Sequence, residues 1–422
     1  MKRLLFLLGG GVIILCLAAG GFWYWINIPP QIKIPTPVMP HPNGYDYFVR
    51  AGAAYVGDSK GVDESTAASI SDKPKKYPLA PKEAWLKKNA KALHLLREGL
   101  KYPALHPSVR SGNFDLKYGQ LRDLARALAV ESHARATRGD WNGAVKSVLD
   151  GYHFGNEIAR GGNLITGLMS VAIRAISLRE LGNLIPHTNA ETAKMAAASM
   201  EKIYLERYPY YENLQEEKWF DIGANLELMR KPSWRLNRVR DMDNTYFQDG
   251  PSPSWKKNAQ MFFISKRSLL NNWTTTMDVL IQNAQQTYPA VQHVSDTGDP
   301  LIDTLLPVFK RARWNWARND TFAVEIMTMY ALHAYKLDHG RYPENLSALE
   351  PAYLPKIPSD PFDGMHSLHY QLQGEKYLLW SIGPDGANNH GKPIINSNSG
   401  RRRYAFTSPD SKGDVVAGIN MP

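Results

Sequence analysis

The chain has 422 residues, of which 43% are hydrophobic and 21% charged, a composition that excludes a mainly disordered protein. Its net charge of +10 is spread along the chain and no nucleic-acid-binding module stands out, so we expect anionic membranes or wall polymers, not nucleic acid, as charged partners. The single cysteine, Cys16, excludes intrachain disulfides and thiolate metal sites.

The first predicted element is a membrane-spanning helix. Residues 4–26 are uncharged and mostly apolar, and a helix of about 20 residues crosses a hydrocarbon core. Lys2 and Arg3 precede this run, and the next cation is Lys33, so the N-terminus should stay in the cytoplasm while the rest is exported. We therefore predict a cytoplasmic stub and transmembrane helix over residues 1–28. A cleaved signal peptide is the alternative, and it would export the same residues.

A proline-rich segment follows the apolar run. Residues 29–43 contain six prolines, a density that disfavours helix and predicts an extended, semi-rigid linker. Such a linker would lift the next domain away from the bilayer.

Residues 44–304 are predicted to form a large helical domain. Apolar residues recur near helical spacing over 83–100, 119–138, 163–183, 189–207, 211–231 and 257–287. Gly139 is expected to form the turn after the second of these helices, and Asp140 to cap a further helix that begins at Trp141. This pair resembles one tetratricopeptide hairpin, without a clean 34-residue repeat. We predict a solenoid or a bundle.

The C-terminal region, residues 305–422, has a different pattern. A helix is predicted from about Asp320 to Asp338, because Gly340 and Pro343 end it. Strands are predicted over 369–372 and 377–382, with 414–418 closing the sheet. The predicted fold class is α+β, with a transmembrane helix, a large helical domain and a small C-terminal domain of a helix plus an antiparallel sheet.

Three motifs in this region resemble the globular module of the major pseudopilin of bacterial type II secretion systems. They are a helix that ends in Asp338-x-Gly340-x-Tyr342-Pro343, the turn Pro358-x-Asp360-Pro361, and the loop Ser381-x-Gly383-x-Asp385-Gly386. The resemblance covers about 100 residues and implies a bacterial cell-envelope setting, hence the inner membrane, with envelope proteins as partners. The apolar N-terminal run lacks the glutamate of that family, so we do not expect this chain to polymerise as a pilin.

The same resemblance implies one calcium ion in the C-terminal loop. Asp385 and Asp414 are the nearest matches to the acidic ligands of that family. The alternative is that Asp385 belongs to a simple turn and Asp414 to a strand edge.

No catalytic motif is recognisable, and we name no catalytic residue. The preferred hypothesis is a membrane-anchored scaffold or binding protein, associated with a secretion or pilus-like apparatus and without enzymatic activity. The alternative is an envelope hydrolase or wall-polymer-binding protein that acts on glycan. It depends on the acids Glu216, Glu217 and Asp221 near Trp219.

Two groups of basic and aromatic residues are candidate binding surfaces for anionic headgroups or wall polymer. The alternative is a solvated basic face with tryptophans that anchor a loop. The first group comprises Arg230, Lys231, Trp234, Arg235, Arg238, Trp255, Lys256 and Lys257. The second comprises Lys310, Arg311, Arg313, Trp314, Trp316 and Arg318.

Overall fold

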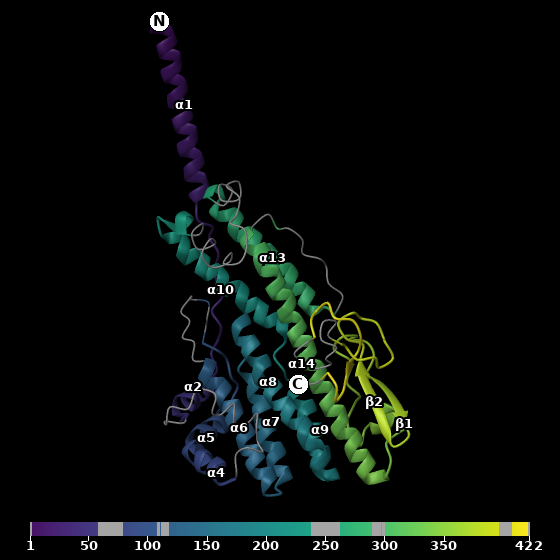
Figure 1. Cartoon of the computed structure of the whole chain (residues 1–422). Helices are drawn as coiled ribbons and strands as arrows, with labels where there is room; N and C mark the ends of the chain where they lie inside the picture. The colour runs from purple at the N-terminus through teal and green to yellow at the C-terminus, as the bar shows by residue number, and fades with distance from the viewer. Residues whose placement is uncertain are drawn as a thin grey trace.

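The computed structural model describes residues 2–57, 79–107, 110, 118–237, 262–288, 297, 300–395 and 407–420, with the side chains of 2–10, 118, 300, 301 and 304 left out. Over these residues the chain is mostly helical, with a small three-stranded antiparallel sheet near the C-terminus. This arrangement confirms the predicted combination of a large helical region and a small sheet. The helical body and the sheet lie on opposite sides of one long helix, α14 (Figure 1).

The N-terminal helix α1, Lys2–Asn27, projects from the body as a single rod (Figure 1). Among the described residues, whose side chains begin at residue 11, no helix is long and apolar enough to cross a membrane. The first part of the predicted span, residues 4–10, lies outside those side chains.

The proline-rich segment is extended, as expected, but it does not separate α1 from the body. Ile32 and Ile34 pack against a core that α8, α10, α13 and α14 share. Arg110 donates a hydrogen bond to the carbonyl oxygen of Pro35. The expected spacer role is therefore wrong, because the apolar residues between the prolines find partners on the body.

The first helices of the body are α2 (Gly44–Ala54), α4 (Leu79–Lys88) and α5 (Ala90–Gly99). The single helix predicted over 83–100 is broken at Asn89. The Asn89 side chain accepts from Val56 N at 2.8 Å and donates to Val56 O at 3.0 Å. Asn89 thus pairs with both backbone polar groups of Val56, in the segment after α2.

The predicted helical pair is confirmed as α6 (Tyr118–Thr137) and α7 (Trp141–Glu157). Gly139 has φ +81°, the left-handed conformation that glycine adopts at little cost. The Asp140 side chain accepts from Gly143 N at 2.8 Å and caps α7. Local signals therefore specify this turn.

Four further helices complete the body next to these: α8 (Leu164–Leu184), α9 (Ala190–Leu205), α10 (Tyr210–Arg230) and α13 (Lys266–Gln285). A 3₁₀ turn, η3 (Ile185–His187), separates α8 from α9. Asn163 and Asn189 cap α8 and α9 through their side-chain oxygens. The bounds of α8, α9 and α10 confirm the predicted ones to within two residues, and α13 lies within the predicted 257–287.

The longest helix, α14 (Pro300–His339), joins the body to the sheet. Its predicted start near Asp320 is wrong by twenty residues, because Phe309, Ala312 and Trp316 are buried against α10 and α13. The expected domain boundary at 304/305 falls inside α14. A second core joins residues of α7, α8, α9 and α14 to residues of the sheet.

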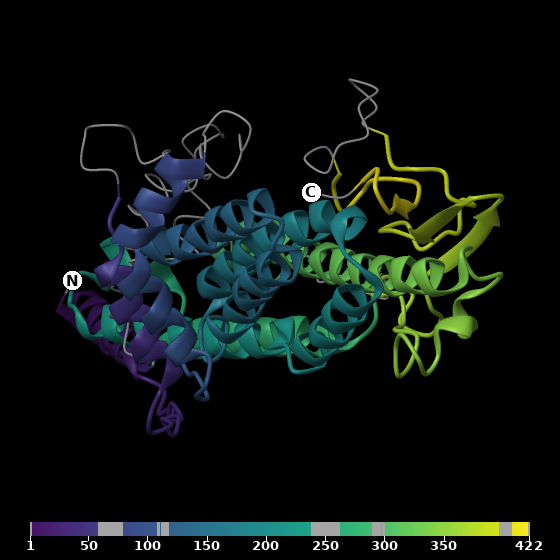
Figure 2. The same cartoon turned by 90° about the horizontal axis from the view of Figure 1, so that it is seen from below.

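The sheet comprises β1 (His369–Gln373), β2 (Lys376–Ser381) and β3 (Val415–Val416), in the order β1-β2-β3. Tyr370 pairs with Leu379, and Ser381 with Val415. This confirms the predicted hairpin and the closing segment. The 3₁₀ turn η4 (Leu346–Leu349) connects α14 to this region, which lies at the opposite end of the molecule from α2 and α5 (Figure 2).

Candidate functional site

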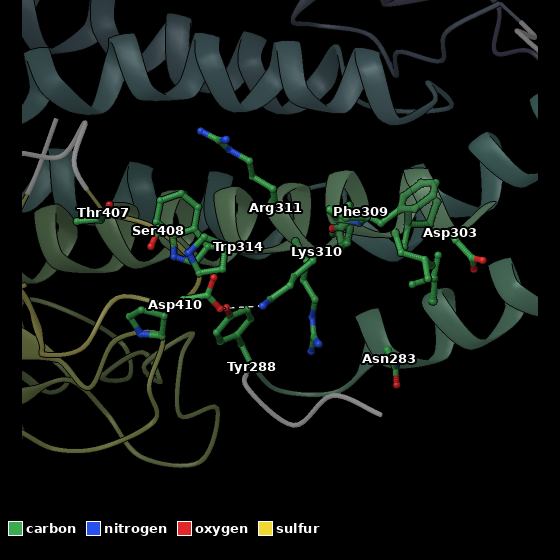
Figure 3. A pocket seen from close by; sticks show the side chains of 18 residues that line it. Asn283, Tyr288, Asp303, Phe309, Lys310, Arg311, Trp314, Thr407, Ser408 and Asp410 are labelled. Carbon is green, nitrogen blue, oxygen red and sulfur yellow. Dashed lines mark hydrogen bonds and ion pairs between the residues drawn. The ribbon is translucent and has the colours of Figure 1, made fainter. Parts of the chain in front are cut away.

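A cavity of about 830 Å³ lies between α10, α13, the first half of α14 and the C-terminal segment 407–410 (Figure 3). Four aromatic side chains contribute to its wall: Tyr210 of α10, Tyr288 from the segment after α13, and Phe309 and Trp314 of α14. The cavity is thus assembled from residues up to 200 positions apart.

Helix α14 supplies neighbouring apolar and basic wall residues. Phe309 and Arg313 are four residues apart, as are Lys310 and Trp314, so each pair lies along one side of the helix. Phe309 and Trp314 are 4% and 3% exposed, which makes them fixed parts of the core. The Tyr210 hydroxyl donates to Phe309 O at 3.1 Å and joins α10 to α14 at the cavity wall.

Arg313 is the central basic group of the wall. Its Nη2 donates to the carbonyl oxygens of Gln286 at 3.0 Å and Thr287 at 3.1 Å, and its guanidinium lies 5.4 Å from the centre of the Tyr288 ring. Its Nη1 is buried without a hydrogen-bond partner. Burial lowers the pKa of Arg313, and no acidic side chain among the described residues pairs with it.

The acids of the cavity wall already have partners. Asp410 pairs with Lys310 at 2.8 Å, across the exposed rim (Figure 3). Asp303 accepts from the backbone N–H and the hydroxyl of Thr297, each at 2.8 Å. Neither carboxylate therefore compensates the charge of Arg313.

A smaller cavity of about 250 Å³ adjoins the first, and Tyr210, Tyr288 and Arg313 line both. Arg207 and Asp320 line the second one. Asp320 is shared by two guanidinium groups, because it lies 2.9 Å from Arg207 Nε and 2.9 Å from Arg174 Nη1.

Arg174 lies behind this wall and is itself almost fully buried. Its Nε and Nη2 have no hydrogen-bond partner. The guanidinium groups of Arg207 and Arg313 thus line the cavities and that of Arg174 lies behind them, and among the described residues Asp320 is the one acid that pairs with any of the three.

The C-terminal loop brings Asp385 and Asp414 together. Asp414 is fully buried and accepts from Asn389 N at 3.0 Å and Gly391 N at 2.6 Å, while Asp385 accepts from Gly413 N at 3.0 Å. Burial raises the pKa of Asp414, and the charge of Asp385 adds to that rise. Within the described part of the chain, no group of three or more His, Cys, Asp or Glu residues could hold a metal ion. The calcium site stays a prediction.

The first basic and aromatic group divides into surface and core residues. Arg230 and Lys231 are exposed, whereas Trp234 and Arg235 are 2% and 4% exposed. The predicted surface role of Trp234 and Arg235 is therefore corrected, because Trp234 packs in the core shared by α10 and α13 and Arg235 bonds to the end of α1. Arg238, Trp255, Lys256 and Lys257 lie outside the described residues.

The acids of the glycan hypothesis do not line either cavity. Glu216 forms an ion pair with Arg110, whose Nε lies 2.8 Å from the carboxylate. Glu217 accepts from Leu164 N at 2.8 Å, and burial raises its pKa to about 7. Burial also raises the pKa of Asp221, and the charge of Glu217 is the second cause. The Glu217 carboxyl thus accepts a hydrogen bond within the fold, at the start of α8.

Part of the cavity wall was predictable from the sequence. The second basic and aromatic group contains Lys310, Arg311, Arg313 and Trp314, all of which line the cavity. Tyr210, Tyr288 and Asp303 were not predicted, because no local pattern relates them to that group. Comparison with protein-family models, curated proteins and solved structures found no match to this chain.

Proposed function

We propose that the protein is a membrane-anchored binding or scaffold protein of the bacterial cell envelope, with its body outside the cytoplasm. The observation that carries this proposal is the exposure of α1. Its consecutive side chains Val12, Ile13, Ile14 and Leu15 are 58–70% exposed, so every side of the helix is apolar and uncovered. Burying one such side chain contributes about 1.5–3 kcal/mol, and lipid would bury all of them.

The attachment of α1 to the body supports the same orientation. Trp23 contacts Phe262 with ring centroids 6.2 Å apart, and Phe22, Tyr24 and Trp25 are exposed at this end of the helix. Tryptophan and tyrosine favour the headgroup level of a bilayer. The end of α1 that meets the body would therefore lie at the outer surface of the membrane.

The C-terminal motifs support the proposed link to a secretion or pilus-like apparatus. The Asp360 carboxylate accepts from Ser381 Oγ at 2.7 Å and from Ile382 N at 3.0 Å, and so joins the Pro-x-Asp-Pro turn to the Ser-x-Gly loop. The Tyr370 hydroxyl donates to Pro343 O at 2.7 Å, which connects β1 to the end of the Asp-x-Gly-x-Tyr-Pro motif. Motifs that are bonded to one another support a shared fold, and a shared fold suggests the setting and not the chemistry.

Reporter fusions test the topology. Alkaline phosphatase, which is active only after export, is fused to the C-terminus of the full chain, and β-galactosidase, which is active only in the cytoplasm, to the same position. We expect phosphatase activity and a protein that stays in the membrane after carbonate extraction. β-Galactosidase activity from the C-terminal fusion would contradict the proposal. Release by carbonate would instead support the cleaved signal peptide.

Crosslinking in intact cells tests the scaffold role. We expect the wild type to recover a reproducible set of envelope proteins. Asp360→Ala should no longer recover those envelope proteins that bind the C-terminal module. Asp363→Ala is the control and should still recover them, because the Asp363 carboxylate, in the same turn, pairs with the exposed His366. Recovery of no reproducible partner by the wild type would contradict the role.

A further inference from the structure

We infer that the cavity between α10, α13 and α14 binds a small molecule that carries a phosphate or carboxylate on an apolar body of about the size of an aromatic ring system. This inference concerns the body of the protein and does not depend on where the body lies. It rests on the size of the cavity, the composition of its wall and the unpaired donor of Arg313.

The cavity has the dimensions of a small-molecule site. Its volume of about 830 Å³ lies in the upper part of the range of about 300–1,000 Å³ for such sites. Phe309 and Trp314 provide rigid apolar walls, and the Tyr210 hydroxyl is occupied by Phe309 O. An apolar or aromatic body would therefore meet mainly carbon atoms there.

Arg313 provides the recognition of an anion. Its Nη2 is held by two carbonyl oxygens, which fixes the plane of the guanidinium, and its buried Nη1 has a donor to spare. A buried donor without a partner costs free energy, and an anionic oxygen would remove that cost with a charge-assisted hydrogen bond. The acids at the rim, Asp303 and Asp410, are engaged elsewhere, so they do not compete for this donor.

The surroundings add positive potential. Arg207, in the wall of the adjoining cavity, and Arg174 behind it share a single carboxylate, that of Asp320. Buried charges interact more strongly than exposed ones, because the low-dielectric interior screens them less. The region between the two cavities therefore favours an anion near Arg313.

Binding of naphthyl phosphate to the full chain, in nanodiscs of zwitterionic phosphatidylcholine without net charge, tests the inference. Isothermal titration calorimetry gives the dissociation constant, and naphthol is the uncharged counterpart. We expect one molecule of naphthyl phosphate per chain, bound at least about tenfold more tightly than naphthol, since hydrogen bonds to charged groups are worth that much. Dihexanoyl phosphatidic acid, a soluble lipid, shows which kind of molecule carries the phosphate. If it binds more tightly than naphthyl phosphate, the ligand class is a lipid, and otherwise it is a soluble aromatic anion.

Three variants locate the site. Arg313→Gln should weaken naphthyl phosphate binding by about tenfold or more and leave naphthol unchanged. Leu306→Trp adds an indole ring to the cavity wall without changing its charge, and it should weaken binding of both by narrowing the space for the apolar body. Arg122→Gln removes an exposed arginine on α6 and should have no effect.

The inference is overturned if wild-type protein binds naphthyl phosphate no better than naphthol, a result that needs no variant to fold. It is equally overturned if Arg313→Gln and Leu306→Trp retain the melting temperature and the affinity of the wild type. If either variant unfolds, Arg313→Lys replaces it, because lysine keeps the charge but lacks the guanidinium fork. The affinity of Arg313→Lys for naphthyl phosphate should then lie between the affinities of the wild type for naphthyl phosphate and for naphthol.

Discussion

The guanidinium of Arg235 donates a hydrogen bond to the carbonyl oxygen of Ile26 at 3.2 Å. Its other nitrogen donates to the carbonyl oxygens of Phe262 and Ile264, so one side chain joins the end of α1 to the segment before α13. The last carbonyl groups of a helix have no partner within the helix, and a cation there also interacts favourably with the helix dipole. Arg235 thus fixes the angle at which α1 leaves the body.

Arg235→Gln should loosen this joint. We expect a loss of about 2 kcal/mol in the free energy of unfolding, because hydrogen bonds from a charged donor are lost. Hydrogen exchange at Asn27 and Ile28 should become faster, while exchange in α7 should not change. Arg230→Gln is the matched control, because Arg230 is exposed and bonded to Glu227 one turn away. Equal effects of the two substitutions would show that Arg235 acts only through net charge.

Asp320→Asn should be among the most destabilising single changes in the body. Asp320 is paired with both Arg174 and Arg207, and Arg174 is almost fully buried. Removal of one partner from a buried ion pair leaves a charge without compensation and costs about 3–5 kcal/mol. Urea unfolding measures this loss.

The control for this substitution is Asp338→Asn, in the same helix. It alters a partly exposed pair with Lys194 and should change stability little. Replacement of Arg174 by Met in the Asp320→Asn background should restore part of the loss, because it removes the unpaired charge. A double variant that is less stable than Asp320→Asn alone would contradict this explanation.

Elements with local signals were predictable from the sequence, and those that depend on distant partners were not. The turn at Gly139 and Asp140 needs only its own residues, and it was predicted correctly. The break at Asn89 was missed because its cause is the backbone of Val56, 33 residues away. The early turns of α14 were missed because Lys310 and Arg311 interrupt its apolar pattern.

The site shows the same division between local and distant information. The cluster around Arg313 and Trp314 was visible as a local composition, yet its cavity also requires Tyr210 and Tyr288. Conversely, the charge of Arg235 suggested a surface position. It is buried because its two terminal nitrogens donate to carbonyl groups of Ile26, Phe262 and Ile264, an arrangement that no local pattern reveals.

Calcium should stabilise the C-terminal loop if the pseudopilin resemblance extends to its ion. Asp385 and Asp414 lie together, and their oxygens accept from backbone N–H groups and retain further lone pairs for a cation. We expect millimolar calcium to raise the melting temperature of the full chain, and this rise to disappear in Asp385→Asn. Asp414→Ala should lower the melting temperature even with a chelator present, because two N–H groups lose their acceptor. No shift of the wild type with calcium would restrict the resemblance to the fold.

Stability should fall as pH rises from acid to neutral because of Glu217. Burial raises the pKa of its carboxyl from 4.5 to about 7, so between these values the folded chain holds a proton that the unfolded chain has released. The contribution of Glu217 is therefore fully present below pH 4.5 and is lost as pH rises towards about 7. Glu217→Gln keeps an acceptor for Leu164 N and removes the ionisation. Its free energy of unfolding relative to that of the wild type should therefore be about 1–2 kcal/mol higher at about pH 8 than at about pH 5.

Urea unfolding at a series of pH values measures this effect of Glu217. Glu227→Gln, an exposed acid on the same helix, is the matched control. Because the Asp221 carboxyl also has a raised pKa, the double variant Asp221→Asn, Glu217→Gln should show a still weaker fall of the free energy of unfolding with pH than Glu217→Gln alone. An equal change in Glu217→Gln and Glu227→Gln would assign the slope to the net charge of α10, and a steeper slope in Glu217→Gln would contradict the direction of the shift.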